Sequence, residues 1–148
     1  MLFNEIYYRD NKEFIDLENG NIIFRNAVRA VIINKNNLLM AHLEKTNVYK
    51  FPGGGKNDNE TIEEALKREV LEEVGYNVKN IYEKIGKIIE YAIAIEGGNN
   101  VFKMESEYYL VEIENIQLKQ NLEDYEKELL FKPCWVNMKT AYEINKKI

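Results

Sequence analysis

The chain has few of the residues that hold small proteins together covalently or through several histidines. It has one cysteine, Cys134, one histidine, His42, and two prolines among 148 residues. A single cysteine excludes an internal disulfide and a multi-cysteine metal site, and a single histidine excludes any catalytic scheme that needs two. Because His42 lies in the apolar-rich segment LLMAHLE, we expect it to have a structural or surface role. The length is sufficient for an ordinary apolar core, so we expect a single domain, 1–148.

Long apolar runs are also absent. The longest, Tyr91 to Ile95, has five residues, whereas a membrane-spanning helix needs about 20. The first residues, MLFNEIYYRDNKEF, carry acids and have no apolar core segment, so they do not resemble a signal peptide. We therefore expect a cytoplasmic protein that does not enter a membrane.

An excess of positive charge is absent too. The chain has 20 lysine and arginine residues against 25 aspartate and glutamate residues, a formal net charge of -5. Proteins that bind duplex nucleic acid neutralise its phosphates with basic side chains, so we do not expect duplex nucleic acid as a partner. A phosphate-bearing small molecule is compatible with this charge, because a divalent cation bridges two anions.

The apolar residues, which make up 45% of the chain, follow patterns typical of a mixed α+β fold with helices packed on a sheet. Residues 26–34, NAVRAVIIN, are β-branched on both faces, as expected for a central buried strand. Residues 1–24 are predicted to form a hairpin or an extension packed on the body. The other predicted elements are strands at 38–44, about 78–95, 101–113 and 131–136, a helix at 61–74, and a terminal helix after Asn137.

The helix predicted within residues 52–75, PGGGKNDNETIEEALKREVLEEVG, has an unusual distribution of charge. On a helical wheel, Glu73 falls inside the apolar stripe, and Glu69 and Glu72 lie along one edge of it. Like charges at this spacing repel each other by roughly 0.2 to 0.5 kcal/mol per pair on an isolated helix. The sequence therefore places carboxylates where their repulsion is unfavourable.

Two interpretations of this helix remain open from the residues alone. One is a solvated, glutamate-rich helix with Arg68 and Glu72 as a surface pair. The other is a site for a divalent cation, since Mg²⁺ takes carboxylate oxygens and shares the rest of its shell between water and substrate phosphates. The three glycines at 53–55 favour the cation site, because glycine lets the backbone approach a ligand or point a carbonyl at a metal.

The same segment resembles the Nudix box, the signature of the Nudix hydrolases. The match spans 23 positions and is complete in its charged and glycine positions, which are Gly54, Glu60, Arg68, Glu69, Glu72, Glu73 and Gly75. Its two apolar positions are occupied by Val70 and by Tyr76, where the family often has an aliphatic residue. The preceding Phe51-Pro52-Gly53 also matches family usage. The resemblance implies the Nudix fold, an α/β/α sandwich with a mixed β-sheet.

The resemblance further implies hydrolysis of a nucleoside diphosphate linked to another group, with Mg²⁺ or Mn²⁺ as the cofactor. Arg68 would orient a glutamate of the box, Glu60 would be a supporting carboxylate, and Gly75 would end the helix in a left-handed conformation. Glu69 is the candidate general base, with a pKa raised by neighbouring like charges. The metal would be held by the carbonyl of Gly54 and the carboxylates of Glu69, Glu72 and Glu73.

Residues outside the box are less constrained by the resemblance. Members of the family often add a metal-binding glutamate from elsewhere, and the candidates here, each of which is otherwise a solvated acid, are Glu105, Glu107, Glu126 and Glu128. The aromatic side chains that could stack a base, each of which is otherwise a core residue, are Phe51, Tyr91, Tyr109 and Trp135. Of these, Phe51 and Tyr91 are the predicted substrate-binding residues.

The leading hypothesis is a small Mg²⁺-dependent pyrophosphohydrolase that acts on a nucleoside triphosphate or a related nucleotide derivative. The sequence features associated with NADH, coenzyme A and many ADP-ribose enzymes are absent, while Tyr91 resembles a marker of dinucleoside polyphosphate hydrolases. An ADP-ribose or dinucleoside polyphosphate hydrolase is the alternative within this chemistry. A non-catalytic nucleotide-binding regulator and a plain interaction domain are the alternatives outside it. A homodimer is the assembly that the family resemblance suggests.

Overall fold

The computed structural model describes residues 2–10, 15, 17–18, 20–93 and 100–147. The elements of this part of the chain are, in order, β1 (Phe3–Tyr8), β2 (Asn21–Val31), β3 (Ile33–Asn34), β4 (Asn37–Leu43), β5 (Val48–Lys50), β6 (Gly53–Gly55), α1 (Ile62–Val74), β7 (Tyr76–Ile93), β8 (Asn100–Gln117), α2 (Asp124–Glu128), β9 (Phe131–Asn137) and α3 (Met138–Asn145). The predicted α+β class is confirmed.

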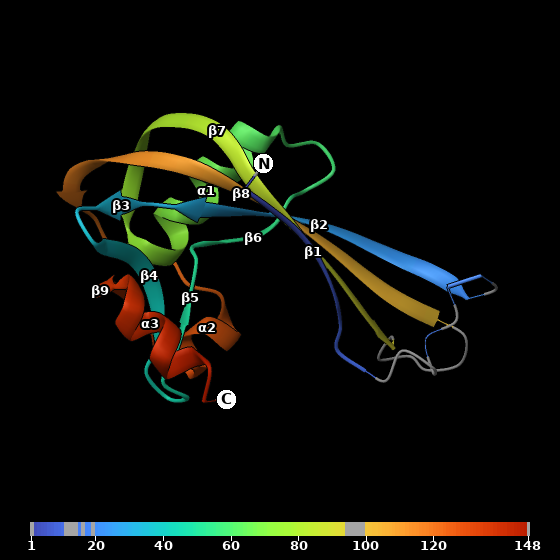
Figure 1. The fold of residues 1–148 in the computed structure, drawn as a ribbon. Coiled ribbons are helices and arrows are strands. Elements are labelled where there is room, and N and C mark those ends of the chain that lie inside the picture. The colour runs from blue at the N-terminus through green and yellow to red at the C-terminus, as the bar shows by residue number, and fades with distance from the viewer. Residues whose placement is uncertain (1, 11–14, 16, 19, 94–99, 148) are drawn as a thin grey trace.

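The strands form two sheets (Figure 1). The larger has five strands in the order β1-β7-β8-β2-β6, and the smaller has four, in which β4 pairs with β3, β5 and β9. In the larger sheet β1 runs parallel to β7 and β2 runs parallel to β8, whereas β7 and β8, like β2 and β6, are antiparallel. The sheet is therefore mixed, as the family resemblance implied.

The helices α1 and α3 cover opposite faces of the strands. On β4, Leu39 and Ala41 belong to the core that α1 buries, whereas Leu38 and Met40 belong to the core that includes Ala141 of α3. Successive residues of a strand point to opposite faces, so the two helices lie on either side of the strand layer. This is the expected α/β/α sandwich.

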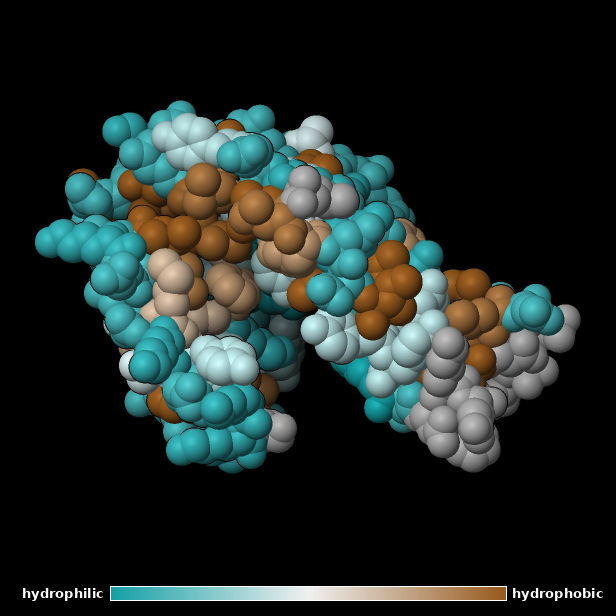
Figure 2. Space-filling model, viewed as in Figure 1, coloured by the Kyte–Doolittle hydropathy of each residue, from teal (hydrophilic) through white to brown (hydrophobic). Residues whose placement is uncertain are grey.

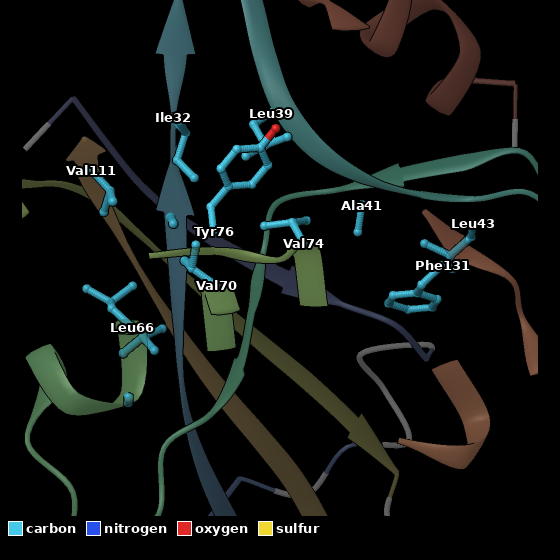
Figure 3. Packing of buried hydrophobic residues seen from close by; sticks show 13 residues of the cluster. Ile32, Leu39, Ala41, Leu43, Leu66, Val70, Val74, Tyr76, Val111 and Phe131 are labelled. Atoms are coloured by element: carbon cyan, nitrogen blue, oxygen red, sulfur yellow. The ribbon is translucent and has the colours of Figure 1, made fainter. Parts of the chain in front are cut away.

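The apolar stripe of α1 anchors the helix to the sheets. Leu66, Val70 and Val74 are fully buried, and Figure 3 shows them among side chains that include Ile32 and Tyr76. Burying an aliphatic side chain of this size stabilises a fold by roughly 1.5 to 3 kcal/mol. The stripe therefore fixes the rotation of α1, and with it the direction of the glutamates on the same helix.

Part of the larger sheet projects from the body as an arm (Figure 1), formed by β1 with the first part of β2, the last part of β7 and the first part of β8. The hairpin or extension predicted for residues 1–24 lies partly outside the described residues, at 1, 11–14, 16 and 19. In the described part, β1 pairs in parallel with β7, from Phe3 opposite Gly86 onward. A Cβ at position 86 would collide with the Phe3 ring. Glycine there lets the ring lie across the strand, where it meets Tyr108 edge-on with centroids 5.3 Å apart.

The remaining predicted elements agree with the structure to within a few residues, although residues 94 and 95 lie outside the described ranges. The predicted strand at 26–34 is divided into β2 and β3. Tyr49-Lys50-Phe51, which the sequence indicates as the end of a strand, corresponds to β5, whereas β6 and α2 were not predicted. These two elements have three and five residues, too few to show a periodic pattern. Among the described residues, no helix has the length and apolar character needed to cross a membrane.

Candidate active site

The ends of α1 are fixed by local hydrogen bonds. The backbone N–H of Glu64 donates to Oγ1 of Thr61, and the N–H of Thr61 donates to Oε1 of Glu64, both at 3.1 Å. This reciprocal capping satisfies N–H groups that the helix leaves free. At the other end Gly75 has φ 76° and its N–H donates to the carbonyls of Val70 and Leu71, so the predicted left-handed end is confirmed.

Arg68 is the centre of a group of three glutamates on one side of α1. Its guanidinium donates to Glu60 twice, from Nε to Oε2 at 2.6 Å and from Nη2 to Oε1 at 2.8 Å. Nη1 donates to Glu69 at 2.9 Å and to Glu72 at 3.4 Å, and Nη2 also reaches the Gly55 carbonyl at 3.2 Å. The hydrogen bonds from Arg68 lower the pKa of Glu60 to about 2.

Glu73 lies inside the apolar stripe, where the helical wheel places it. It is 3% exposed, and its Oε1 has no hydrogen-bond partner in the described part of the chain. Burial raises the pKa of Glu73 well above its ordinary value, Arg29 opposes this, and Glu126 and Glu69 add to it. An ionised carboxylate that is buried without a partner is energetically unfavourable. A proton or a cation bound at Glu73 would therefore stabilise this side of the helix.

Gly54 lies directly against Glu69. It pairs with Val28 between β6 and β2, and a Cβ at position 54 would be 2.7 Å from Oε1 of Glu69. Any larger residue would therefore displace the carboxylate. Burial raises the pKa of Glu69, Arg68 opposes the shift, and Glu72 and Glu126 add to it.

The structure separates the four glutamates proposed as additions to the box. Glu126 of α2 is 5% exposed and raises the pKa of both Glu69 and Glu73, so it lies with them. Glu128 is exposed. The other two candidates, Glu105 and Glu107, form ion pairs on the larger sheet. They line a hollow of about 690 Å³ whose lining includes none of the proposed metal-binding glutamates of α1.

The donor set suits a hard divalent cation, although it is not yet arranged around one. Carboxylate and carbonyl oxygens are the ligands that Mg²⁺ prefers, Oε1 of Glu73 is free, and Gly54 leaves room beside Glu69. Within the described ranges, no three Asp, Glu, His or Cys side chains are placed to hold an ion. Nη1 of Arg68 donates to one oxygen of each neighbouring carboxylate, Oε1 of Glu69 and Oε2 of Glu72, so the other oxygen of each can bind an ion while Arg68 keeps both hydrogen bonds.

The aromatic candidates are scattered. Phe51 lines a cleft of about 250 Å³, whereas Tyr91 stacks on Tyr8 in the arm with centroids 5.5 Å apart and is not among the residues lining that cleft. The hydroxyl of Tyr109 donates to Glu107 at 2.7 Å. Trp135 lines a separate hollow. The structure therefore brings Phe51, and not the other three, to the cleft.

Arg29 is a functional candidate that the sequence analysis missed. It lies on β2, and its Nη1 donates to the carbonyls of Phe51 at 3.2 Å and Gly53 at 3.0 Å. Its charge lowers the pKa of Glu73 against the effect of burial. The signal was an arginine in the middle of the apolar strand NAVRAVIIN.

His42 occupies the structural role expected of it. Its ring stacks on Tyr49 with centroids 4.4 Å apart, and its Nε2 lies 2.9 Å from Oδ1 of Asn47. Neither contact involves the glutamates of α1. The contacts of the only histidine of the chain are thus separate from the glutamates of α1.

The fold and the glutamates of α1 are those of a known protein family. The family model described as NUDIX domain matches residues 23–147. The chain belongs to this family. Among solved structures, a mutator MutT protein from Bacillus halodurans has a TM-score of 0.59 at 22% identity, covering 81% of this chain and 72% of that one. The ORF135 protein of E. coli has a TM-score of 0.56 at 15% identity, covering 84% and 81%. At these identities the likeness shows the fold.

Proteins called RNA pyrophosphohydrolase are similar to this chain in sequence. The protein of Sulfurovum sp. (strain NBC37-1) is 31% identical over 112 residues, which are 70% of this chain and 71% of that relative. The protein of Pasteurella multocida (strain Pm70) is 44% identical over 59 residues, which are 39% of this chain and 30% of that relative. The second match thus spans less than a third of the relative's length.

Proposed function

We propose that the protein is a hydrolase that cleaves a phosphoric anhydride bond in a nucleotide-derived substrate and depends on Mg²⁺ or Mn²⁺. The observation that carries this proposal is the group of shielded carboxylates from two helices, in which Oε1 of the buried Glu73 has no hydrogen-bond partner among the described residues. Buried carboxylates at this density need positive charge. A nucleotide diphosphate also needs positive charge, so one ion would serve both.

The residues that would hold the ion are Glu69, Glu72 and Glu73 of α1, with Glu126 of α2 and the carbonyl of Gly54. When bound, such an ion neutralises phosphate charge and lowers the pKa of a bound water. Arg68 would keep Glu69 and Glu72 oriented through the bonds from Nη1. Glu60 would in turn fix Arg68, since it accepts from both Nε and Nη2.

Glu69 is the proposed general base. Its side chain is 12% exposed, and burial raises its pKa, which brings a carboxylate closer to the range in which it accepts a proton at neutral pH. In the reaction a water oxygen forms a bond to phosphorus, the anhydride P–O bond breaks, and the water proton passes to Glu69. The products are two phosphate groups in place of one anhydride.

A nucleoside triphosphate or a related nucleotide derivative is the leading substrate. RNA pyrophosphohydrolase activity is the second candidate, because relatives that match the chain carry that name. The net charge of -5 does not favour extended contact with a nucleic acid, so any contact with RNA would be confined to its phosphate end. A non-catalytic regulator is disfavoured because Glu69, Glu72 and Glu73 are all present.

The proposal is tested by incubating the protein with nucleoside triphosphates, ADP-ribose, dinucleoside polyphosphates and 5′-triphosphorylated RNA in Mg²⁺ or Mn²⁺. Released phosphate and pyrophosphate are measured. We expect turnover of at least one substrate, and loss of that turnover in Glu69→Gln. Glu63→Gln is the matched control, because Glu63 lies on the same helix but is exposed and pairs with Lys67 at 2.8 Å. No release from any substrate with either ion would refute the proposal.

A further inference from the structure

A cleft of about 250 Å³ lies where the arm meets the body, and Figure 2 shows the surface hollowed between these two parts. Its lining includes three basic side chains, those of Arg9, Arg29 and Lys50, and one acid, Glu90. Arg29 donates to the carbonyl of Gly53 at 3.0 Å, and the next residue, Gly54, lies directly against Glu69. The cleft is therefore close to the glutamates of α1.

The basic side chains of the cleft differ in how they are paired. Arg9 forms an ion pair with Glu90. Arg29 uses only Nη1, toward the carbonyls of Phe51 and Gly53, which leaves Nε and Nη2 without a hydrogen-bond partner among the described residues. Lys50 has no ion pair or side-chain hydrogen bond in the same part of the chain. Two cations thus share one cleft with donors to spare, in a protein whose net charge is negative.

Like charges that share a cleft are unfavourable unless an anion lies between them. A guanidinium held by backbone carbonyls is also pre-organised for a planar, two-bond contact with phosphate. The bonds to Phe51 and Gly53 hold Arg29 at the start of the segment that leads to Gly54. A phosphate bound by Arg29 would consequently be positioned relative to the carboxylates.

The size and the walls of the cleft indicate which part of a nucleotide it would take. Its volume is below the roughly 300 to 1,000 Å³ of sites that enclose a whole drug-sized ligand. The aromatic wall is already occupied, since Phe51 packs edge-on against Tyr108 at 5.6 Å, and Tyr108 packs against Phe3. Phosphate groups fit this space better than a stacked base.

We propose that Arg29 and Lys50 form a phosphate subsite that holds the phosphates of the substrate beyond the bond that is hydrolysed. Arg29 is the positioning residue and Lys50 the second cation. This inference rests on the proposed function and narrows its substrate class to nucleoside polyphosphates, because a diphosphate between two sugars has no further phosphate to place there.

The first test measures pyrophosphate binding by calorimetry without added metal, so that no turnover is involved. We expect the wild-type protein to bind pyrophosphate, Lys50→Gln to weaken binding about fivefold, and Arg29→Lys to weaken it about tenfold, because lysine keeps the charge but loses the planar fork. Lys87→Gln is the matched control. Lys87 pairs with Glu105 at 3.4 Å and does not line the cleft.

Three outcomes would overturn the subsite: no binding of pyrophosphate by the wild-type protein, equal binding by wild type and both cleft variants, or equal weakening in Lys87→Gln. Lys50 is exposed, so its substitution tests the site even if changes at Arg29 disturb folding. Circular dichroism melts of each variant check that point.

The second test compares substrates. In Lys50→Gln and Arg29→Lys we expect KM for a nucleoside triphosphate to rise about five- to tenfold with a smaller change in kcat. KM for ADP-ribose should not change. An equal effect on both substrates would contradict the subsite. Pyrophosphate binding that depends on Lys50 in a protein without hydrolytic activity would refute the proposed function and retain the subsite.

Discussion

Glu60, just before α1, and Glu73, on α1, are held in opposite ways. On one side Glu60 receives two hydrogen bonds from Arg68, and its pKa falls to about 2. On the other side Glu73 is buried with a free Oε1, and its pKa is raised well above the ordinary value. The same residue type is thus satisfied within the protein at one position and left in need of a cation at the other. The first arrangement serves stability, and the second indicates a ligand.

The largest expected effect comes from removing the charge of Glu73. Glu73→Gln should lower the rate with Mg²⁺ by about a thousandfold, similar to the loss of one oriented electrostatic group in other active sites. Its unfolding free energy should not fall, because an unpaired buried charge is removed. Rates and thermal melts are measured beside Glu63→Gln, which should retain both. A Glu73→Gln protein with near wild-type activity would contradict the metal assignment.

The effect of added metal on the unfolding free energy should distinguish Glu60 from Glu73. If Mn²⁺ binds only the folded protein, a concentration of 100 times Kd should stabilise it by about 2.7 kcal/mol. We expect this shift in the wild-type protein and in Glu60→Gln, and its absence in Glu73→Gln. Urea unfolding with and without Mn²⁺ measures it. If neither Mn²⁺ nor Mg²⁺ changed the unfolding free energy of the wild-type protein, the cation site would be disproved.

Loss of Arg68 should disturb the satisfied side. Arg68→Met leaves three glutamates without their shared partner, and since Arg68 is 28% exposed, we expect a loss of about 2 kcal/mol, below the cost of breaking a fully buried pair. Lys67→Met is the control, because the Lys67–Glu63 pair is exposed and surface pairs of this kind contribute little to stability. Urea unfolding measures the loss of unfolding free energy in Arg68→Met and in Lys67→Met. Equal losses would show that the hydrogen bonds of Arg68 stabilise the fold no more than an exposed ion pair does.

The smallest expected effect concerns pH. The folded-state pKa of Glu60 is depressed to about 2, so its contribution to stability is complete above its ordinary pKa and is lost as pH falls toward 2. The difference in unfolding free energy between wild type and Glu60→Gln should therefore shrink between pH 5 and pH 2.5.

For Glu73 the sign is reversed. Its pKa is raised in the folded protein, so the stability that Glu73 contributes is present at low pH and is lost as pH rises. In the absence of metal, the unfolding free energy of Glu73→Gln relative to wild type should thus increase toward neutral pH. If Glu60→Gln and Glu73→Gln instead changed with pH in the same direction relative to wild type, the contrast between the two glutamates would be wrong.

Local features of the site were predictable from the sequence. The span of α1, the burial of Glu73 and the left-handed Gly75 all depend on periodicity and on residues within one or two turns of each other. The cap of α3 is of the same kind, since Oδ1 of Asn137 accepts from the N–H groups of Lys139 and Thr140. Such interactions are encoded in neighbouring residues, so a single sequence contains them.

Features that join distant segments were not predictable. Glu126 could not be distinguished from Glu105, because only the packing of the five-residue helix α2 against β9 brings it near Glu73. The parallel pairing of β1 with β7 joins residues more than 80 positions apart. No local pattern specifies a partner at that distance, and a short edge strand pairs wherever register and side-chain space allow.

The chain's own residues determined the helix, its crowded glutamates and the glycines before it, because charge and periodicity act over a few residues at a time. The tertiary structure alone decided which carboxylates lack a partner and where Arg29 and Lys50 converge. Desolvation and charge proximity depend on every segment that packs around a group, so they come into being only when the sheets and helices are assembled.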